Sequence, residues 1–445
     1  MINNLARGAE NTDGQRFRLM KRKRLFILFG ISAAYLVSYF HRSAPAVVGP
    51  EIASELNLAP ASLGVLGSMY FWAYAGAQLP AGVLADTWGA RKTMSFFILL
   101  AAAGGAVFAL ASGLSLLSLG RFFVGLGVGF IYVPAVRVMT DWYRADELAT
   151  YSGILLAVGN IGALISAAPL VFMMQSVGWR NTFLTVAFFT VLAAVFCWRF
   201  VRDKPSDMGL PGPDGKEAAV AADLQPEKTK LAQALAAVFS QPRFYLLGFL
   251  MFCFYGTLMS VGSLWSGGYL QHVCGLSQQA AGNIIMMFPL GMVLGCPLSG
   301  YLSDKIIPSR KKILICGAAL HLTAYIPLIF ISGIPNAFLY ALFLWYGITG
   351  GFFVSNFACA KETVDSRFAG TAIGAVNVFL FSGAAFFQAI LGVVIGRYSR
   401  PEERLYPPEA YKATFVVAAV SLAVAAVLFF FFKEGKKTQA AEARP

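Results

Sequence analysis

The sequence predicts an all-α membrane protein with twelve transmembrane helices, six on each side of one long polar segment. Hydrophobic residues occupy 58% of the 445 positions and charged residues only 13%, about half the charged share of an ordinary soluble domain. Twelve apolar runs are long enough to cross a bilayer, which takes about 20 residues. A loop motif after the second run has a degenerate copy after the eighth, which indicates an internal duplication.

The predicted spans follow one another closely except at 202–243. This segment begins with charged residues and prolines, and it separates an N-terminal region, 1–201, from a C-terminal region, 244–445. We interpret it as a cytoplasmic linker. The predicted spans are 25–50, 61–85, 93–111, 116–140, 150–174, 181–201, 244–269, 279–302, 312–333, 336–358, 369–396 and 411–432.

The basic residues orient these spans. With both termini in the cytoplasm, the cytoplasmic segments hold most of the 35 Lys and Arg residues, as the positive-inside rule requires. The net charge of +13 then reflects topology signals and contacts with anionic lipid, so no nucleic-acid partner is expected. The Lys and Arg residues outside the cytoplasmic segments are Arg42, Arg121, Arg180, Arg397, Arg400, Arg404 and Lys412.

No catalytic, metal or cofactor site is expected. The six cysteines form no CxxC pair and no metal-ligand spacing with histidine, and five of them lie in apolar runs, where a thiol behaves as a small hydrophobe. The spans contain no nucleophile–base pair, and the chain has no P-loop to bind ATP. We therefore do not expect the protein to be an enzyme.

The loop after the second span reads GVLADTWGARK over 82–92, and its copy reads GYLSD over 300–304, followed by Arg310-Lys311-Lys312. The first copy resembles the GxLaDrxGrrk loop of the major facilitator superfamily. The stretch RFFVGLG over 121–127 is similar to the RxxxGxG motif of that superfamily's fourth span, and GNIG over 159–162 resembles its glycine-rich fifth span.

The resemblance implies two six-helix bundles related by an axis along the membrane normal, with the substrate site between them near the bilayer midplane. Transport then proceeds by alternating access. The resemblance also implies that Asp86 contacts the N-terminal end of span 11, where a helix N-terminus favours a carboxylate. Gly89, Arg91, Asp304 and Arg310 are the other candidate residues of the conformational gate.

Charged residues inside a membrane are costly and mark functional sites. Arg42 lies in span 1 and Arg121 in span 4, whereas no Asp or Glu occupies the central part of any span. A bound anion is the simplest neutralising partner for such arginines, and the planar guanidinium suits a carboxylate or phosphate. The sequence therefore predicts an anionic substrate bound by Arg42 and Arg121.

Helical periodicity supplies further candidates for lining the substrate site. Tyr35, Ser38 and Arg42 share one face of span 1, and Arg121 and Tyr132 share one face of span 4. For each neutral side chain, packing between helices is the alternative interpretation. The candidates in the second set of spans are Trp265, Tyr269, Asn356, Asn377 and Gln388.

Tyr39-Phe40-His41-Arg42 is similar to the YxDR sequence of the anion:cation symporter branch of the superfamily, whose members move organic anions, often with protons. Here His41 replaces the aspartate, and Val128 stands where the branch's RxxxGxxE pattern has a carboxylate. Because the unperturbed pKa of histidine is about 6.5, His41 is the candidate proton carrier, with a neutral hydrogen-bonded histidine as the alternative.

The expected function is secondary active transport of a small organic anion, a carboxylate or a phosphorylated metabolite, with proton symport as the preferred coupling. We expect a monomer in the inner membrane of a bacterium. Three alternatives stay open: an inorganic anion porter of the nitrate/nitrite type, a drug or cation exporter of the same fold, and a transporter-like sensor that binds its ligand without moving it.

Overall fold

The computed structural model describes residues 2–144, 147–213, 231–307, 309–331, 333–365, 368–398 and 406–434, without the side chains of 2–17, 149, 231 and 304. Within these ranges the secondary structure is helical and contains no strand. Ten stretches are long and apolar enough to cross a membrane, and Thr150–Ile165 is a shorter apolar helix. One stretch, Pro60–Ala109, holds two predicted spans. The prediction of an all-α membrane protein is confirmed.

The first six spans comprise more than six helical segments because several spans are interrupted. Span 3 is the single continuous helix α4, whereas spans 1, 4 and 5 are each divided. The segments are α1 (Ile2–Ser43), α2 (Pro45–Glu55), α3 (Pro60–Leu84), η1 (Ala85–Gly89), α4 (Ala90–Ala109), α5 (Leu114–Gly129), α6 (Tyr132–Trp142), α7 (Leu148–Ile165), α8 (Ala168–Phe200) and the short η2 (Pro205–Met208).

The last six spans are interrupted in the same manner. Spans 7, 8 and 10 each contain a change of helix type or a break. The segments are α10 (Leu231–Phe239), α11 (Pro242–Ser260), η4 (Val261–Trp265), α12 (Ser266–His272), α13 (Gln278–Ile285), α14 (Met287–Tyr301), η5 (Leu302–Ile306), α15 (Arg310–Phe330), α16 (Asn336–Gly350), η6 (Gly351–Ser355), α17 (Asn356–Glu362), α18 (Ala369–Gly396) and α19 (Pro408–Phe429).

Two breaks have clear local causes. Pro45 occupies the first position of α2, where its missing N–H costs nothing, so span 1 divides directly after Arg42 and Ser43. Gly178 has φ of +77° inside α8, a conformation that glycine adopts without strain. This glycine separates the end of span 5 from the start of span 6. It lies between residues 174 and 181, where the sequence predicts that one span ends and the next begins.

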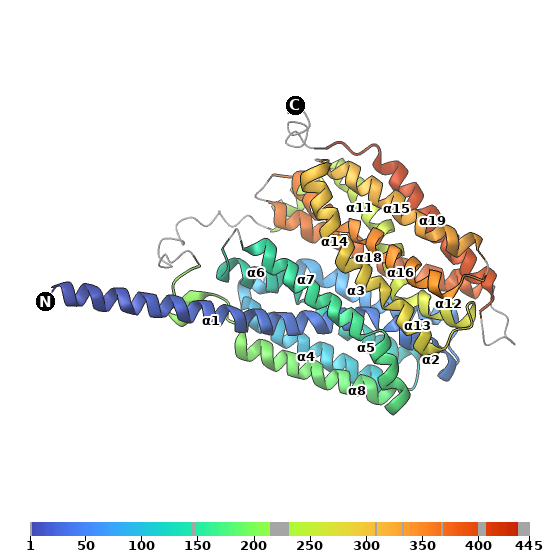
Figure 1. The fold of residues 1–445 in the computed structure, drawn as a ribbon, viewed down its shortest axis with the longest axis horizontal. Coiled ribbons are helices and arrows are strands. Elements are labelled where there is room, and N and C mark those ends of the chain that lie inside the picture. Colours follow the sequence, from blue (N-terminus) through green and yellow to red (C-terminus); the bar gives the residue numbers. More distant parts are fainter. Residues whose placement is uncertain are drawn as a thin grey trace.

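Figure 1 shows the helices before residue 201 grouped in one body, in blue to green, and those after residue 242 in another, in yellow to red. Helix α3 packs along α18 and forms the most extensive contact between the two groups. Small residues permit this approach, because a Cβ on Gly64 would lie 3.2 Å from the Cα of Ala389. The candidate functional site lies at this junction.

Charged residues mark the two ends of the spans. One end, here called the basic end, carries Arg24 of α1 together with Arg91, Arg137 and Arg310, and the other, the opposite end, carries the charged Glu55 and the polar Gln278. Between the ends, large apolar side chains are exposed on the outside of the molecule. Phe172, Phe188 and Phe330 are 68%, 59% and 74% exposed, as expected for surfaces that contact lipid.

Candidate functional site

Arg42 lies near the C-terminal end of α1, deep between the two ends. At 1.5 Å per residue it is about 27 Å along α1 from Arg24, just before the break between α1 and α2, and thus within a hydrocarbon layer about 30 Å thick. Only 5% of Arg42 is exposed. Its position therefore requires that the protein or a ligand compensate its charge.

Aromatic side chains from four helices surround the Arg42 guanidinium. Its Nη1 donates a hydrogen bond to the Tyr255 hydroxyl on α11, 3.3 Å away. The guanidinium carbon lies 4.5 Å from the ring centre of Tyr39, 5.1 Å from Tyr74 and 5.3 Å from Phe381, within the range of cation–π attraction. We call these five residues the Arg42 chamber. Helices of both groups build it.

The predicted residues of spans 1 and 4 adjoin this chamber. The Tyr35 ring packs 5.0 Å from Tyr39 and 5.6 Å from Tyr132. The Ser38 hydroxyl is buried and has no hydrogen-bond partner in the described structure. Three of the predicted lining residues thus extend the chamber along α1 and α6.

Asn377 and Asn356 also lie beside the junction of the two groups. Asn377 Nδ2 donates to Gln78 Oε1 on α3 at 3.3 Å, which joins α18 to α3. Asn356 Nδ2 donates to the Phe353 carbonyl at 2.6 Å, and the Phe353 ring packs 4.9 Å from Tyr255. Asn356 Oδ1 is buried without a partner among the described residues.

The other predicted lining residues contact different groups. Gln388 Nε2 donates to Ser263 at 3.2 Å. The Trp265 indole lies against Gly392, and its N–H has no partner within the described ranges. Tyr269 packs on Tyr411 and Phe415, with ring centres 5.8 and 5.1 Å away. None of these contacts reaches the Arg42 chamber.

Arg121 and His41 meet through the backbone. Arg121 Nη1 donates to the His41 carbonyl at 2.9 Å, and its guanidinium lies 4.8 Å from the Tyr70 ring centre. The His41 ring lies 3.4 Å from the Thr190 hydroxyl on α8 and packs edge-on against Phe40. Arg121 therefore fixes the backbone directly before Arg42, whereas the His41 ring contacts the neighbouring helix.

Neither arginine forms an ion pair with a carboxylate in the part of the chain that the structure describes. The ion pairs there lie at the two ends, at Arg24–Glu147, Arg137–Asp86, Arg137–Asp141, Arg180–Glu55 and Arg310–Glu362. The described residues also contain no cluster of His, Cys, Asp and Glu that could hold a metal ion. The buried positive charge thus lacks a protein counter-ion among them.

The first loop motif forms contacts within its own group of helices. Asp86 pairs with Arg137 of α6, Oδ1 to Nε 3.3 Å, so its expected contact with span 11 stays a prediction for another conformation. Arg91 N donates to Asp203 Oδ1 at 2.7 Å, and Arg91 Nε donates to the Trp198 carbonyl at 2.9 Å. Gly89, with φ of +94°, lets Asp203 approach, because a Cβ there would clash with that carboxylate.

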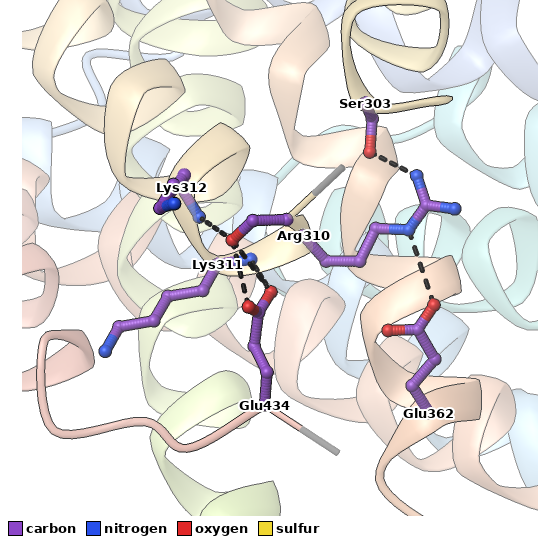
Figure 2. A network of polar contacts seen from close by, with 7 residues as sticks. Ser303, Arg310, Lys311, Lys312, Glu362 and Glu434 are labelled. Atoms are coloured by element: carbon purple, nitrogen blue, oxygen red, sulfur yellow. Dashed lines mark hydrogen bonds and ion pairs between the residues drawn. The ribbon is translucent and has the colours of Figure 1, made fainter. Parts of the chain in front are cut away.

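The second loop motif forms a network shown in Figure 2. Arg310 hydrogen-bonds the Ser303 hydroxyl and pairs with Glu362, Nε to Oε1 3.4 Å. Glu434, after α19, accepts from the Lys311 backbone N–H at 2.7 Å and from the Ser309 hydroxyl. A carboxylate is favourable at this N-terminus of α15. The Asp304 side chain lies outside the described residues.

At the opposite end, polar contacts connect the two groups of helices. Gln278 Nε2 of α13 donates to Glu51 Oε2 at 3.1 Å and lies 3.4 Å from the Val47 carbonyl. Nearby, Glu55 accepts from Trp179 Nε1 at 2.5 Å and pairs with Arg180. The hydrogen bond from Trp179, followed by the contact with Arg180, lowers the pKa of the Glu55 carboxyl below its ordinary value. At this end, the contact of Gln278 with Glu51 therefore joins the two groups of helices.

Sequence reasoning missed Tyr70, Tyr74, Tyr255 and Phe381. Tyr70, Tyr74 and Gln78 recur every four residues on α3 and therefore share one face. The same periodicity identified Tyr35, Ser38 and Arg42 on α1, so it could have identified this second face. Tyr255 and Phe381 have no comparable sequence signal, because each stands among many apolar neighbours.

Comparison with known proteins agrees with this architecture. Residues 31–388 match the family described as the Major Facilitator Superfamily. A probable hexose phosphate transport protein of Chlamydia trachomatis is 25% identical over 83% of this chain and 85% of its own length. A probable sulfoacetate transporter of Cupriavidus necator is 24% identical over 92% and 94%. A membrane sensor protein of Salmonella typhimurium is 25% identical over 83% and 84%.

Among solved structures, a bacterial homologue of the human lysosomal transporter Spinster, in an inward-facing and unoccupied conformation, superposes with a TM-score of 0.72. The two sequences are 19% identical, and the match covers 95% of this chain and 99% of the other. At this identity the similarity concerns the fold alone.

Proposed function

This chain belongs to the major facilitator superfamily, and from that premise we propose that it carries a small organic anion across a membrane by alternating access. The observation that carries the proposal is the position of Arg42. Its buried guanidinium lies between helices of both groups, in contact with Tyr255 of α11, and has no carboxylate partner in the described structure.

An anionic group neutralises this arginine at the least cost. The planar guanidinium donates two parallel hydrogen bonds to a carboxylate, phosphate or sulfonate. Relatives named for hexose phosphate and for sulfoacetate transport support an anionic substrate. The sequence predicts that Arg121 binds the same anion. Its hydrogen bond to the His41 carbonyl favours a different role, in which Arg121 positions the backbone that carries Arg42.

The neutral groups of the chamber favour a substrate with several hydroxyl or carbonyl oxygens. Tyr255 presents its hydroxyl to the guanidinium, and the rings of Tyr39 and Tyr74 lie against it. Ser38 and Asn356 each keep a buried polar atom without a partner in the described structure. We therefore propose a small hydroxylated carboxylate or a phosphorylated metabolite.

We propose that the two groups of helices, 1–201 and 244–445, are bundles that move relative to each other. The linker between them is 202–243, of which 214–230 lie outside the described residues. At the basic end, Asp86 and Arg310 each pair within one bundle, and Arg91 bonds Asp203 at the start of the linker. Gln278–Glu51 joins the bundles at the opposite end. This combination fits a conformation open toward the basic end, which the positive-inside rule assigns to the cytoplasm.

The decisive experiment is uptake by purified protein in proteoliposomes. Radiolabelled hexose phosphates, sugar acids and sulfonates are offered in turn, with empty liposomes as the control. Saturable uptake of one of them, inhibited by unlabelled substrate but by neither nitrate nor lipophilic cations, supports the proposal. Transport of nitrate alone, or of a lipophilic cation, would replace it with one of the alternative functions.

Proton symport is the proposed coupling, with His41 as the candidate carrier. His41 is 1% exposed and directly precedes Arg42, so a proton on its ring would change the potential at the chamber. A proton gradient imposed across the proteoliposome should accelerate uptake, and a protonophore should abolish the acceleration. In His41→Gln, substrate exchange should persist while the response to the gradient disappears; an unchanged response would exclude His41.

A second candidate function is ligand sensing without transport. It is favoured by the similarity to membrane sensor proteins of Salmonella typhimurium and Escherichia coli. A sensor would gain thermal stability from its ligand, because a ligand that binds only the folded state raises apparent stability, yet it would give no flux. Proteoliposome uptake and thermal unfolding of the same preparation distinguish the two. We propose a monomer in the inner membrane of a bacterium, with both termini cytoplasmic, in either case.

A further inference from the structure

Two arginines converge at the basic end of α4 and α8, which lie side by side in the first group of helices (Figure 1). Arg91, at the start of α4, donates from Nε to the Trp198 carbonyl of α8 at 2.9 Å. Arg202, two residues after α8, donates from Nη1 to the same oxygen at 3.3 Å and to the Val201 carbonyl at 2.7 Å. Two positive charges therefore share one neutral acceptor.

Neither guanidinium forms an ion pair with a carboxylate in the part of the chain that the structure describes. Asp203 lies beside them, but its Oδ1 accepts from the backbone N–H of Arg91 and so stabilises the N-terminal end of α4. Burial, followed by the positive charge of Arg91, lowers the pKa of Arg202 below its ordinary value, and Asp203 opposes this change with a smaller effect. Positive charge thus remains in excess at this place.

Each of the two arginines also keeps adjacent donors available. Nη1 and Nη2 of Arg91, and Nε and Nη2 of Arg202, have no hydrogen-bond partner within the described ranges. Both residues are partly exposed. Two neighbouring nitrogens of a guanidinium donate parallel hydrogen bonds to a phosphate group. The pair can therefore hold a phosphate from two sides.

Apolar side chains continue from this pair along the outside of α4 and α8. Trp198 is 49% exposed, and the Arg91 guanidinium carbon lies 4.2 Å from its ring centre. Farther from the basic end, Phe96 of α4 and Val195 of α8 are exposed. Tryptophan is enriched where a span meets the membrane–water interface. The two arginines thus lie at the level of lipid headgroups, next to a surface that contacts acyl chains.

We infer that Arg91, Arg202 and Trp198 form a binding site for one anionic phospholipid of the phosphatidylglycerol class. Its phosphate lies between the two guanidinium groups, and an acyl chain lies along Phe96 and Val195. Anionic headgroups attract basic residues at the cytoplasmic surface of a membrane. A soluble phosphate compound would use only the arginines, whereas a phospholipid also covers the adjacent apolar surface.

Quenching of Trp198 fluorescence by brominated acyl chains tests the inference. The full-length protein is reconstituted in mixtures of phosphatidylcholine and phosphatidylglycerol, of which only one is brominated. The difference between each protein and its Trp198→Phe variant isolates the Trp198 signal. We expect brominated phosphatidylglycerol to quench this signal with a preference of about 25-fold over phosphatidylcholine, because each arginine near a membrane surface contributes a factor of about five.

Arg91→Gln and Arg202→Gln should each reduce the preference to about fivefold. Arg397→Gln, at an exposed arginine of the opposite end, is the matched control and should keep the wild-type preference. The inference is overturned if the two brominated lipids quench Trp198 equally, or if Arg202→Gln keeps the full preference. Should Arg91→Gln not reconstitute, Arg202→Gln still decides, because this partly exposed side chain follows the end of α8.

Glycerol 1-phosphate, a soluble compound with the same phosphate chemistry, is the second arm of the test. At a concentration equal to that of the lipid headgroups it should leave the quenching unchanged. If it abolishes the preference for phosphatidylglycerol, the site binds a soluble phosphate and the inference is wrong. The site belongs to the first group of helices and the start of the linker, and its readout requires no transport, so it stands apart from the proposed function.

Discussion

Arg42 of α1 donates a hydrogen bond to the hydroxyl of Tyr255 on α11, with 3.3 Å between Nη1 and the phenolic oxygen. This contact joins a helix of the first group to one of the second at the depth where a substrate would bind. A long hydrogen bond to a neutral phenol compensates little of a buried charge. An anion that replaces or supplements it would therefore change how the two groups contact each other.

Arg42→Ala should reduce substrate uptake in proteoliposomes at least about 30-fold, because removing one partner of a buried charge pair costs about 2–5 kcal/mol. Arg42→Lys should retain part of the activity, since it keeps the charge but loses the planar donor pair. Arg199→Ala, an exposed arginine near the basic end, is the control and should transport normally. Wild-type uptake by Arg42→Ala, measured on monodisperse protein, would contradict the proposed site.

Tyr255→Phe tests the neutral part of the chamber. It removes one hydroxyl that contacts Arg42 but keeps the ring, so the fold should persist. We expect KM to rise about tenfold, corresponding to about 1.4 kcal/mol, near the lower bound for hydrogen bonds to charged groups. Tyr245→Phe, an exposed position on the same helix, should leave KM unchanged. Equal KM values for both variants would show that the Tyr255 hydroxyl takes no part in binding.

The sequence was sufficient to predict the helical class, the approximate spans and the buried position of Arg42, because hydropathy and charge are local properties of a segment. It did not predict the breaks at Ala44–Pro45 or within span 7. Pro45 favours the first break locally, but both breaks also depend on contacts with other helices: α2, which begins at Pro45, packs on η4 and α12 of the other group. Tertiary contacts of this kind leave little trace in a single sequence.

The candidate site shows the same limit. Periodicity predicts that Tyr35 and Ser38 lie on the same face of α1 as Arg42, since one helix determines their relative positions, and the Tyr35 ring packs beside Tyr39. Periodicity could not determine which faces of α11 and α18 turn toward α1. Tyr255 and Phe381 were therefore missed, while Tyr269 was predicted as a lining residue and instead packs on α19.

The contact between Gln278 and Glu51 provides a test of the closed opposite end. In a Cys274→Ser background, Glu51→Cys with Gln278→Cys should be bridged by a short bifunctional thiol reagent, because the native side chains lie 3.1 Å apart. Bridging should stop uptake, and reduction of the linkage should restore it. Each single cysteine variant should keep its uptake after the same treatment. Full transport by the bridged protein would show that this end need not open.

The contacts of Glu55 should make the free energy of unfolding depend on pH in the acidic range. Its carboxyl accepts a hydrogen bond from Trp179 and pairs with Arg180, and these contacts lower the pKa of Glu55 in the folded state. A lowered folded pKa means that the stabilisation is present above the unfolded value of about 4.3. It is lost as the pH falls through the folded pKa, where the carboxylate becomes protonated.

Glu55→Gln should therefore unfold at a lower temperature than the wild type at pH 7, and the difference should vanish as the pH falls through the folded pKa of Glu55, which lies below the unfolded value. The Glu55 side chain is 42% exposed, so solvent screens the pair and the difference in free energy of unfolding should stay below about 1 kcal/mol. Added salt should reduce it further. Glu409→Gln, exposed in the first turn of α19, is the control. A difference that grows on acidification would contradict the assignment, because only a carboxylate stabilised in its charged form loses its contribution in that direction.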